Sequence, residues 1–192
     1  MTPGVPNGWA IDRFPGDFTD SETAVFQTVP DLGPSVLTFT MYFMHLNPGH
    51  LLGRFRLSVT TDDRSTYADG LAVGGDVTAN WTVLTDLTVD GPPGMTFTTL
   101  PDDSILAGGT DPGQGVYVVS GETDLSGITG FRLEAIKDPS LPANGPGFYA
   151  NGNFILSEIQ LDASPVPEPA TLTLLGIAFA GMGFIRQRSR TG

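Results

Sequence analysis

Two histidines are the only side chains in this sequence whose unperturbed pKa lies near neutral pH, and the chain has no cysteine. His45 lies between Met44 and Leu46, where we expect it to pack at a strand end, and His50 follows a Pro-Gly turn, where we expect it to face solvent. Neither lies near a Gly-x-Ser-x-Gly motif of the kind that presents a nucleophilic serine. The sequence therefore argues against a serine triad, and the absence of cysteine excludes a thiol nucleophile and a disulfide. We predict that the protein is not an enzyme.

Two pairs of adjacent carboxylates, Asp62-Asp63 and Asp102-Asp103, resemble the acid and base pair of a glycosidase in composition alone. A glycosidase holds its two carboxylates about 5 to 9 Å apart across the sugar, and adjacency in a turn does not establish that separation. We favour turn-forming aspartates whose oxygens bind nearby backbone N–H groups.

The elements that position these residues are predicted to be short strands, because the chain combines 25 Gly and 16 Pro with 40% hydrophobic residues. The predicted fold class is all-β, an antiparallel β-sandwich or jelly roll followed by a short C-terminal hydrophobic helix. In the clearest strand, Phe55, Leu57 and Val59 face inward and the alternate residues, including Ser58 and Thr60, face water. The predicted strands are 9–14, 23–29, 36–43, 51–60, 81–89, 95–100, 115–120, 128–135 and 154–162.

Charge is distributed unevenly along the chain, which carries a formal net charge of −12. Residues 1–165 hold 6 basic and 20 acidic residues, whereas residues 166–192 hold 3 basic residues and 1 acidic residue. An acidic surface repels phosphate, so we predict that nucleic acid is not a partner.

The C-terminal segment combines three unlike features in a fixed order. Pro167-Glu168-Pro169 precedes an apolar run over residues 170–185, and Arg186, Arg188 and Arg190 follow it. As a helix the run would reach about 24 Å, which is short of the roughly 30 Å hydrocarbon core but sufficient with local thinning and snorkelling of the arginines. The arginines favour the inner side of the membrane.

This order closely resembles the PEP-CTERM sorting signal of exported bacterial proteins. The resemblance implies recognition by an exosortase-type membrane protease at Pro167, Glu168 and Pro169, a transient inner-membrane anchor through residues 170–185, and delivery to the cell surface or extracellular matrix. The first residues, Met1 to Trp9, lack the basic and apolar regions of a signal peptide. We therefore expect two parts: a β-sandwich over 1–163, truncated at its N-terminus, and a sorting and anchor segment over 164–192.

Several stretches of the body resemble a galactose-binding-like (discoidin-like) jelly-roll domain. The stretches that carry this resemblance are Gly8–Asp12, His50–Thr60, Trp81–Leu84, Asp103–Ala107, Gly127–Ala135, Asp138–Pro142, Gly145–Gly147 and Asn151–Glu158. The resemblance implies a β-sandwich with a binding role, carbohydrate being the commonest ligand class. It also implies one structural calcium ion, held by Glu158 on the final strand together with Asp12 or Asp17.

A sugar site needs aromatic faces together with amide or carboxylate groups. The loop aromatics are Tyr67, Phe148 and Tyr149, and Asn151 and Asn153 lie close to the last two in sequence, whereas Trp9 and Trp81 are expected in the core. Asn151-Gly152-Asn153 also fits a turn with left-handed backbone.

Two hypotheses account for these features. The first is a non-catalytic surface or extracellular-matrix protein of a bacterium, such as a component of a biofilm matrix, with weak carbohydrate binding. The alternative is a substrate-binding accessory module of an exported enzyme whose catalytic part is missing from this chain.

Overall fold

The computed structural model describes residues 8–11, 20–67 and 78–166, and these residues form antiparallel β-sheets. The six-stranded sheet runs in the order β2 (Glu22–Leu32), β10 (Ile128–Ala135), β4 (Arg54–Thr60), β8 (Ile105–Gly109) and β7 (Met95–Thr99), and β5 (Thr82–Val83) also pairs with β4. The four-stranded sheet runs β12 (Glu158–Pro165), β3 (Ser35–Phe43), β9 (Gly115–Thr123) and β6 (Thr88–Asp90). A small third sheet pairs β1 (Trp9–Ala10) with β11 (Ile155–Leu156). Two short 3-10 turns, η1 (Arg64–Thr66) and η2 (Pro142–Asn144), lie in loops.

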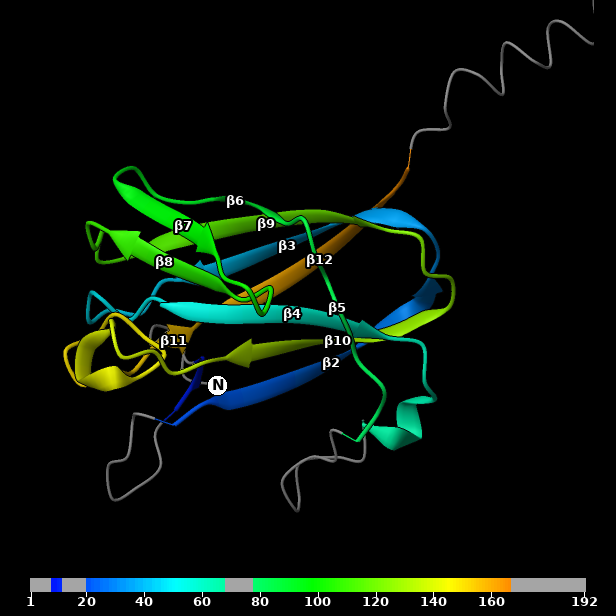
Figure 1. The fold of residues 1–192 in the computed structure, drawn as a ribbon, viewed down its shortest axis with the longest axis horizontal. Coiled ribbons are helices and arrows are strands. Elements are labelled where there is room, and N and C mark those ends of the chain that lie inside the picture. The colour runs from blue at the N-terminus through cyan, green and yellow to red at the C-terminus, as the bar shows by residue number, and fades with distance from the viewer. Residues whose placement is uncertain (1–7, 12–19, 68–77, 167–192) are drawn as a thin grey trace, which may run out of the picture.

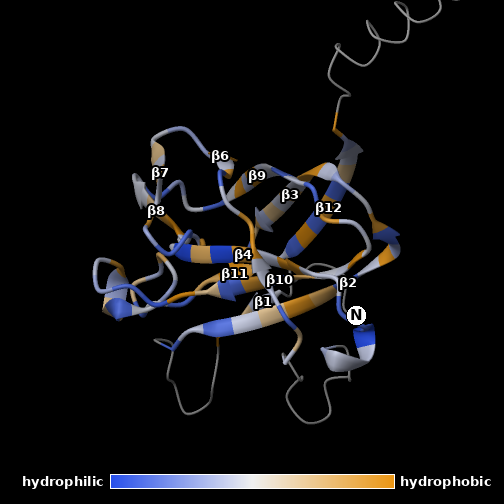
Figure 2. Ribbon diagram, turned by 45° about the vertical axis from the view of Figure 1, so that its right-hand side comes forward, coloured by the Kyte–Doolittle hydropathy of each residue, from blue (hydrophilic) through white to orange (hydrophobic). Residues whose placement is uncertain are grey.

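The two larger sheets pack against each other across one apolar core (Figure 1). Alternation along the strands produces this core, since every second residue of β3 is buried. Phe39 of β3 contacts Phe131 of β10 edge to face, with ring centroids 5.2 Å apart. Figure 2 shows apolar and polar bands alternating along β4 and β12, as expected for strands with one face turned to the core. The predicted all-β, antiparallel class is therefore confirmed.

Several predicted strands differ in detail from the observed ones. The segment 81–89 contains two short strands, β5 and β6, and 154–162 divides at Ser157 into β11 and β12. Strand β8 was not predicted. The predicted division after residue 163 falls within β12, which continues to Pro165. The predicted C-terminal helix lies outside the described residues, and within them no helix is long and apolar enough to cross a bilayer.

The prediction that Ser58 and Thr60 face water was wrong, because both are buried on the outer face of the six-stranded sheet. A small second layer covers that face. Tyr67 is 1% exposed and contacts Trp81 edge to face, and the Arg132 guanidinium lies 5.1 Å from the Trp81 ring centre. The ring of Tyr67 therefore faces protein and not a loop surface, and Trp81 lies in this outer layer, outside the central core.

Candidate functional site

The predicted sugar-binding residues lie in the long connection between β10 and β11. This connection is held by backbone hydrogen bonds to the segment that immediately precedes β4: Gly53 N donates to Pro146 O at 2.7 Å, and Phe148 N donates to Leu51 O at 2.9 Å. Gly147 lies against the backbone of the same loop, since a Cβ placed on it would clash with Asn153 O. The close approach of two backbone segments thus fixes the position of Phe148 and Tyr149.

Phe148 and Tyr149 do not line the same surface. Phe148 lines a shallow hollow of about 400 Å³ on the outer side of β7 and β8, whose other lining residues include Thr96, Thr98 and Ser140. Tyr149 is absent from that lining and stacks on His50, with ring centroids 3.9 Å apart and planes inclined by 19°. One ring therefore borders a hollow rich in hydroxyl groups, and the other packs against a histidine.

The two predicted asparagines shape the local turn. The Asn151 side-chain oxygen accepts a hydrogen bond from Asn153 N at 3.0 Å, and the Asn153 side-chain oxygen accepts one from Phe154 N at 2.8 Å. Gly152 between them has φ of 88°, in the left-handed region that glycine tolerates. This geometry is that of the turn that the sequence also allowed. In the described structure both side-chain oxygens are engaged with backbone, so a sugar at this position would compete with the turn itself.

His50 is 6% exposed, so the prediction of a solvated histidine was wrong. Its Nδ1 lies 3.0 Å from Asn47 O, and the half-buried ring of His45 contacts it edge to face. Burial lowers the pKa of His50 below its ordinary value of 6.5, although the hydrogen bond to Asn47 acts in the opposite direction. This burial was not predictable from local sequence, because Tyr149, which covers the ring, is about one hundred residues away along the chain.

One carboxylate of each pair forms a local turn with a backbone N–H, as expected. Asp63 Oδ1 accepts a hydrogen bond from Ser65 N at 2.9 Å, and Asp102 Oδ1 accepts one from Ser104 Oγ at 2.6 Å. These hydrogen bonds lower the pKa of both carboxyls. Asp62 accepts instead from Asn80 N at 2.7 Å.

Arg54 connects the loop that carries Phe148 to the sheet. Its guanidinium donates to Asp138 Oδ2 at 3.1 Å, to Asp102 Oδ2 at 2.8 Å and to Ser104 Oγ at 2.9 Å. Burial opposes the charge of Asp138, but hydrogen bonds from Ser140 and the charge of Arg54 outweigh it, so the pKa of Asp138 lies below its ordinary value. Ser140, which lines the hollow, is thereby fixed through Asp138 and Arg54.

Of the predicted calcium ligands, Glu158 is exposed on β12, where its carboxylate accepts a hydrogen bond from Gln160 Nε2 at 2.8 Å. Asp12 and Asp17 lie outside the described residues. Among the residues that the structure describes, no three His, Asp or Glu side chains are grouped to hold a metal ion.

The comparisons with known proteins identify the other functional segment. Residues 165–189 match the family model of the PEP-CTERM protein-sorting motif. The match begins at the last residue of β12 and includes Pro167, Glu168, Pro169, Arg186 and Arg188, all of which lie outside the described residues; Arg190 falls one residue beyond the match. No curated protein and no solved structure matches the chain.

The class that the motif defines is that of exported proteins sorted by exosortase, which is a membrane protein. The motif implies a transient membrane anchor, followed by a cell-surface or extracellular location. This chain joins such a motif directly to an antiparallel β-sandwich.

Proposed function

We propose that this chain is a non-catalytic protein of the bacterial surface or extracellular matrix, in which exosortase releases the sandwich from its transient anchor. The match of residues 165–189 to the sorting motif carries this proposal. The acidic body agrees with it, because an excess of 20 acidic over 6 basic residues in 1–165 keeps an exported domain soluble.

The sorting part is tested by fractionating a host that has an exosortase and an isogenic strain that lacks it, using the chain supplied with a signal peptide. The expected result is release of the sandwich only from the strain with exosortase. Glu168→Ala should leave the protein in the membrane, whereas Glu158→Ala, a matched change of an exposed glutamate outside the motif, should not alter release. Equal release from both strains would overturn the proposal.

We further propose that the sandwich binds polysaccharide weakly through the hollow beside Phe148. An apolar ring next to hydroxyl groups is the combination that a sugar ring with its own hydroxyls requires. Thr96, Thr98 and Ser140 supply hydroxyl groups around the aromatic face. The discoidin-like jelly-roll resemblance of the body is consistent with this ligand class and remains a hypothesis.

Affinity electrophoresis in gels containing the host's own extracellular polysaccharide tests this site. Phe148→Ala should weaken retardation about tenfold, equivalent to 1.4 kcal/mol. Thr98→Val, which removes only an exposed hydroxyl, should weaken it without affecting folding. Tyr149→Ala is the control, since its ring lies on His50 and does not line the hollow. Retardation unchanged in both Phe148→Ala and Thr98→Val would exclude the hollow as the site.

A further inference from the structure

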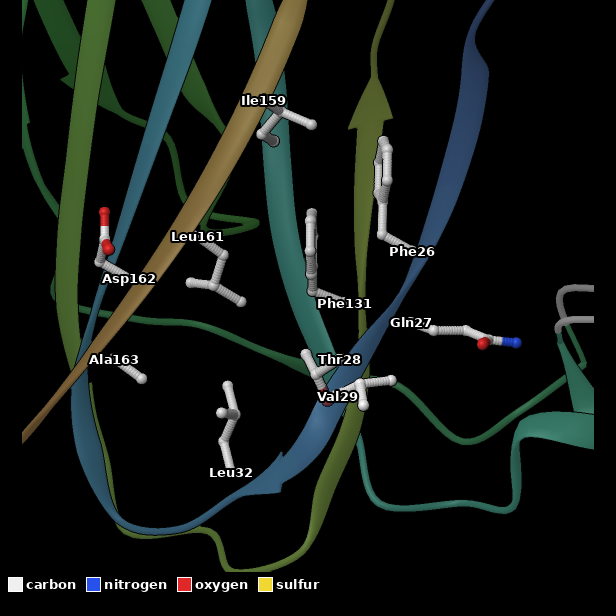
Figure 3. A pocket seen from close by; sticks show the side chains of 10 residues that line it. All are labelled: Phe26, Gln27, Thr28, Val29, Leu32, Phe131, Ile159, Leu161, Asp162 and Ala163. Carbon is white, nitrogen blue, oxygen red and sulfur yellow. The ribbon is translucent and has the colours of Figure 1, made fainter.

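A groove of about 470 Å³ with a mixed polar and apolar lining lies along one open side of the sandwich, between strands β2 and β12 (Figure 3). Among the residues that the structure describes, each of these strands ends its sheet and has one unpaired edge. The groove is separate from the hollow beside Phe148. Its lining residues are Phe26, Gln27, Thr28, Val29, Leu32, Phe131, Ile159, Leu161, Asp162 and Ala163.

The inner wall of the groove is made of stacked aromatic rings. Phe26 and Phe131 lie with centroids 4.6 Å apart and planes inclined by 12°. Ile159 and Leu161 point toward them from β12, whereas Asp162 points away (Figure 3). Val29 at the rim is 87% exposed. A strand edge that is unpaired in the described structure, beside half-buried apolar side chains such as Ile159 and Leu161, favours pairing with a further strand.

The chain itself carries a segment that fits this position. Strand β12 ends at Pro165, and after four residues the sequence reads Ala170-Thr171-Leu172-Thr173-Leu174, which alternates polar and apolar residues as a half-buried strand does. We propose that residues 170–174, the beginning of the apolar run of the sorting segment, dock in the groove as a strand antiparallel to β12.

The register follows from the connection. With Val166–Pro169 as a four-residue hairpin loop, Ala170 lies opposite Pro165, Leu172 opposite Ala163 and Leu174 opposite Leu161. Ile159, Leu161 and Ala163 line the groove, so this register turns Leu172 and Leu174 toward Phe131 and Thr171 and Thr173 toward solvent. A shift of the register by one residue would turn the threonines toward Phe131 and the leucines toward solvent. The two prolines of the loop lie where no ladder N–H is needed.

A second copy of the protein is a poorer occupant. If β12 of two copies paired antiparallel about Gln160, Glu158 of each would face Asp162 of the other, and like charges directly opposite are destabilising. The net charge of −12 on each copy adds repulsion. The segment that adjoins the groove carries no charge between Ala170 and Ile185.

Docking would give this segment two competing positions, on the sandwich in water and in the lipid bilayer. The groove then covers the first leucines of the apolar run until the segment inserts into the bilayer. The sandwich thus acts as an intramolecular chaperone for its own sorting segment. This inference rests on the groove and the sequence alternation, and its test uses no sorting protease, so its failure would leave the proposed sorting function untouched.

The chain has no cysteine, so a pair of introduced cysteines reports proximity without interference. Asp162→Cys with Thr173→Cys places two thiols directly opposite each other on the outer face in the proposed register, within disulfide range. Glu122→Cys with Thr173→Cys is the matched control. Glu122 of β9 and Ser164 of β12 both pair with Val36 of β3, so Glu122 lies within similar reach of the segment but on the far side of β3.

The measurement is the rate of disulfide formation in the full chain under mild oxidation in buffer without detergent. We expect an intramolecular disulfide between positions 162 and 173 to form at least tenfold faster than the control disulfide. Adding Leu172→Asp and Leu174→Asp should return the rate to the control value, because carboxylates cannot be buried unpaired against Phe131. Equal rates for the two pairs, or a disulfide-linked dimer as the main product, would overturn intramolecular docking.

Discussion

Replacing Arg54 with methionine tests whether ion pairing fixes the loop that carries Phe148. The side chains of Arg54 and Asp138 are only 18% and 10% exposed, so solvent screens their interaction weakly. Methionine keeps the apolar stem and removes the charge, which leaves Asp138 with hydrogen bonds from Ser140 alone. Removing one partner of a buried pair costs about 3 to 5 kcal/mol.

Residual exposure and the hydrogen bonds from Ser140 reduce that cost, and we expect a loss of about 2 to 3 kcal/mol at pH 7. The second partner, Asp102, is 42% exposed, so its ion pair adds little. For a domain of this size, the loss corresponds to a fall in Tm of about 4 to 12 °C. Lys137→Met is the control, because it removes a pair in which both side chains are more than half exposed and should cost less than about 1 kcal/mol.

The stability loss in Arg54→Met should also depend on pH. The folded-state pKa of Asp138 lies below its ordinary value of 3.8, so its contribution to stability is complete above that pH and is lost as the pH falls through the folded-state pKa. The difference in stability between the wild type and Arg54→Met should therefore shrink below about pH 4. Urea unfolding at pH 7 and at several acidic pH values measures it. A wild-type midpoint for Arg54→Met at pH 7, or a difference that stays constant in acid, would refute the reasoning.

Three further changes test other parts of the structure. Tyr117→Phe removes a buried hydroxyl that donates to Leu52 O at 3.1 Å, and it should lower the free energy of unfolding in urea by about 1 to 2 kcal/mol. Tyr42→Phe removes an exposed hydroxyl that donates to Gln160, so its loss should be smaller. Equal losses for the two variants would contradict this. Gly147→Ala should destabilise the fold by about 2 kcal/mol, because the added Cβ would clash with Asn153 O, and a wild-type Tm would refute the close approach. The pKa of His50, measured by NMR, should lie below 6.5. Its contribution to stability is therefore complete above pH 6.5 and declines as the pH falls below that value. A pKa of 6.5 or higher would contradict the role of burial.

The sequence was informative wherever a strand has one buried and one solvated face. Phe55, Leu57 and Val59 of β4 alternate with polar residues and are all buried, as predicted. The alternation failed to describe Ser58 and Thr60, because a sheet face covered by a loop no longer faces water. Tyr67 and Trp81 supply that cover through contacts that no local pattern indicates.

Strand β8 was missed for a related reason. Its residues Ile105–Gly109 follow a turn and end in two glycines, which leaves an apolar run of three residues, too short to predict a strand. Pairing with β4 and β7 makes it a strand. Pairing partners far along the chain, and not local propensity, decide such segments.

The candidate sites also differ in how far the sequence predicts them. The sorting motif was predictable because its elements are contiguous and lie in a fixed order, and residues 165–189 match it. The hollow beside Phe148 joins Thr96 and Thr98 to Ser140 across more than forty residues of chain, and the groove joins β2 to β12 across more than one hundred and twenty. Only the folded topology brings such residues together.

The intact mass and location of the mature protein test the central claim most directly. The chain, supplied with a signal peptide, would be expressed in a host that contains an exosortase, and both cell fractions and medium would be analysed. We predict a surface or extracellular form that keeps the whole sandwich up to β12 and has lost the residues after the Pro-Glu-Pro sequence. A protein that retains its C-terminus through Gly192 in the inner membrane would contradict the account and make the segment a simple anchor.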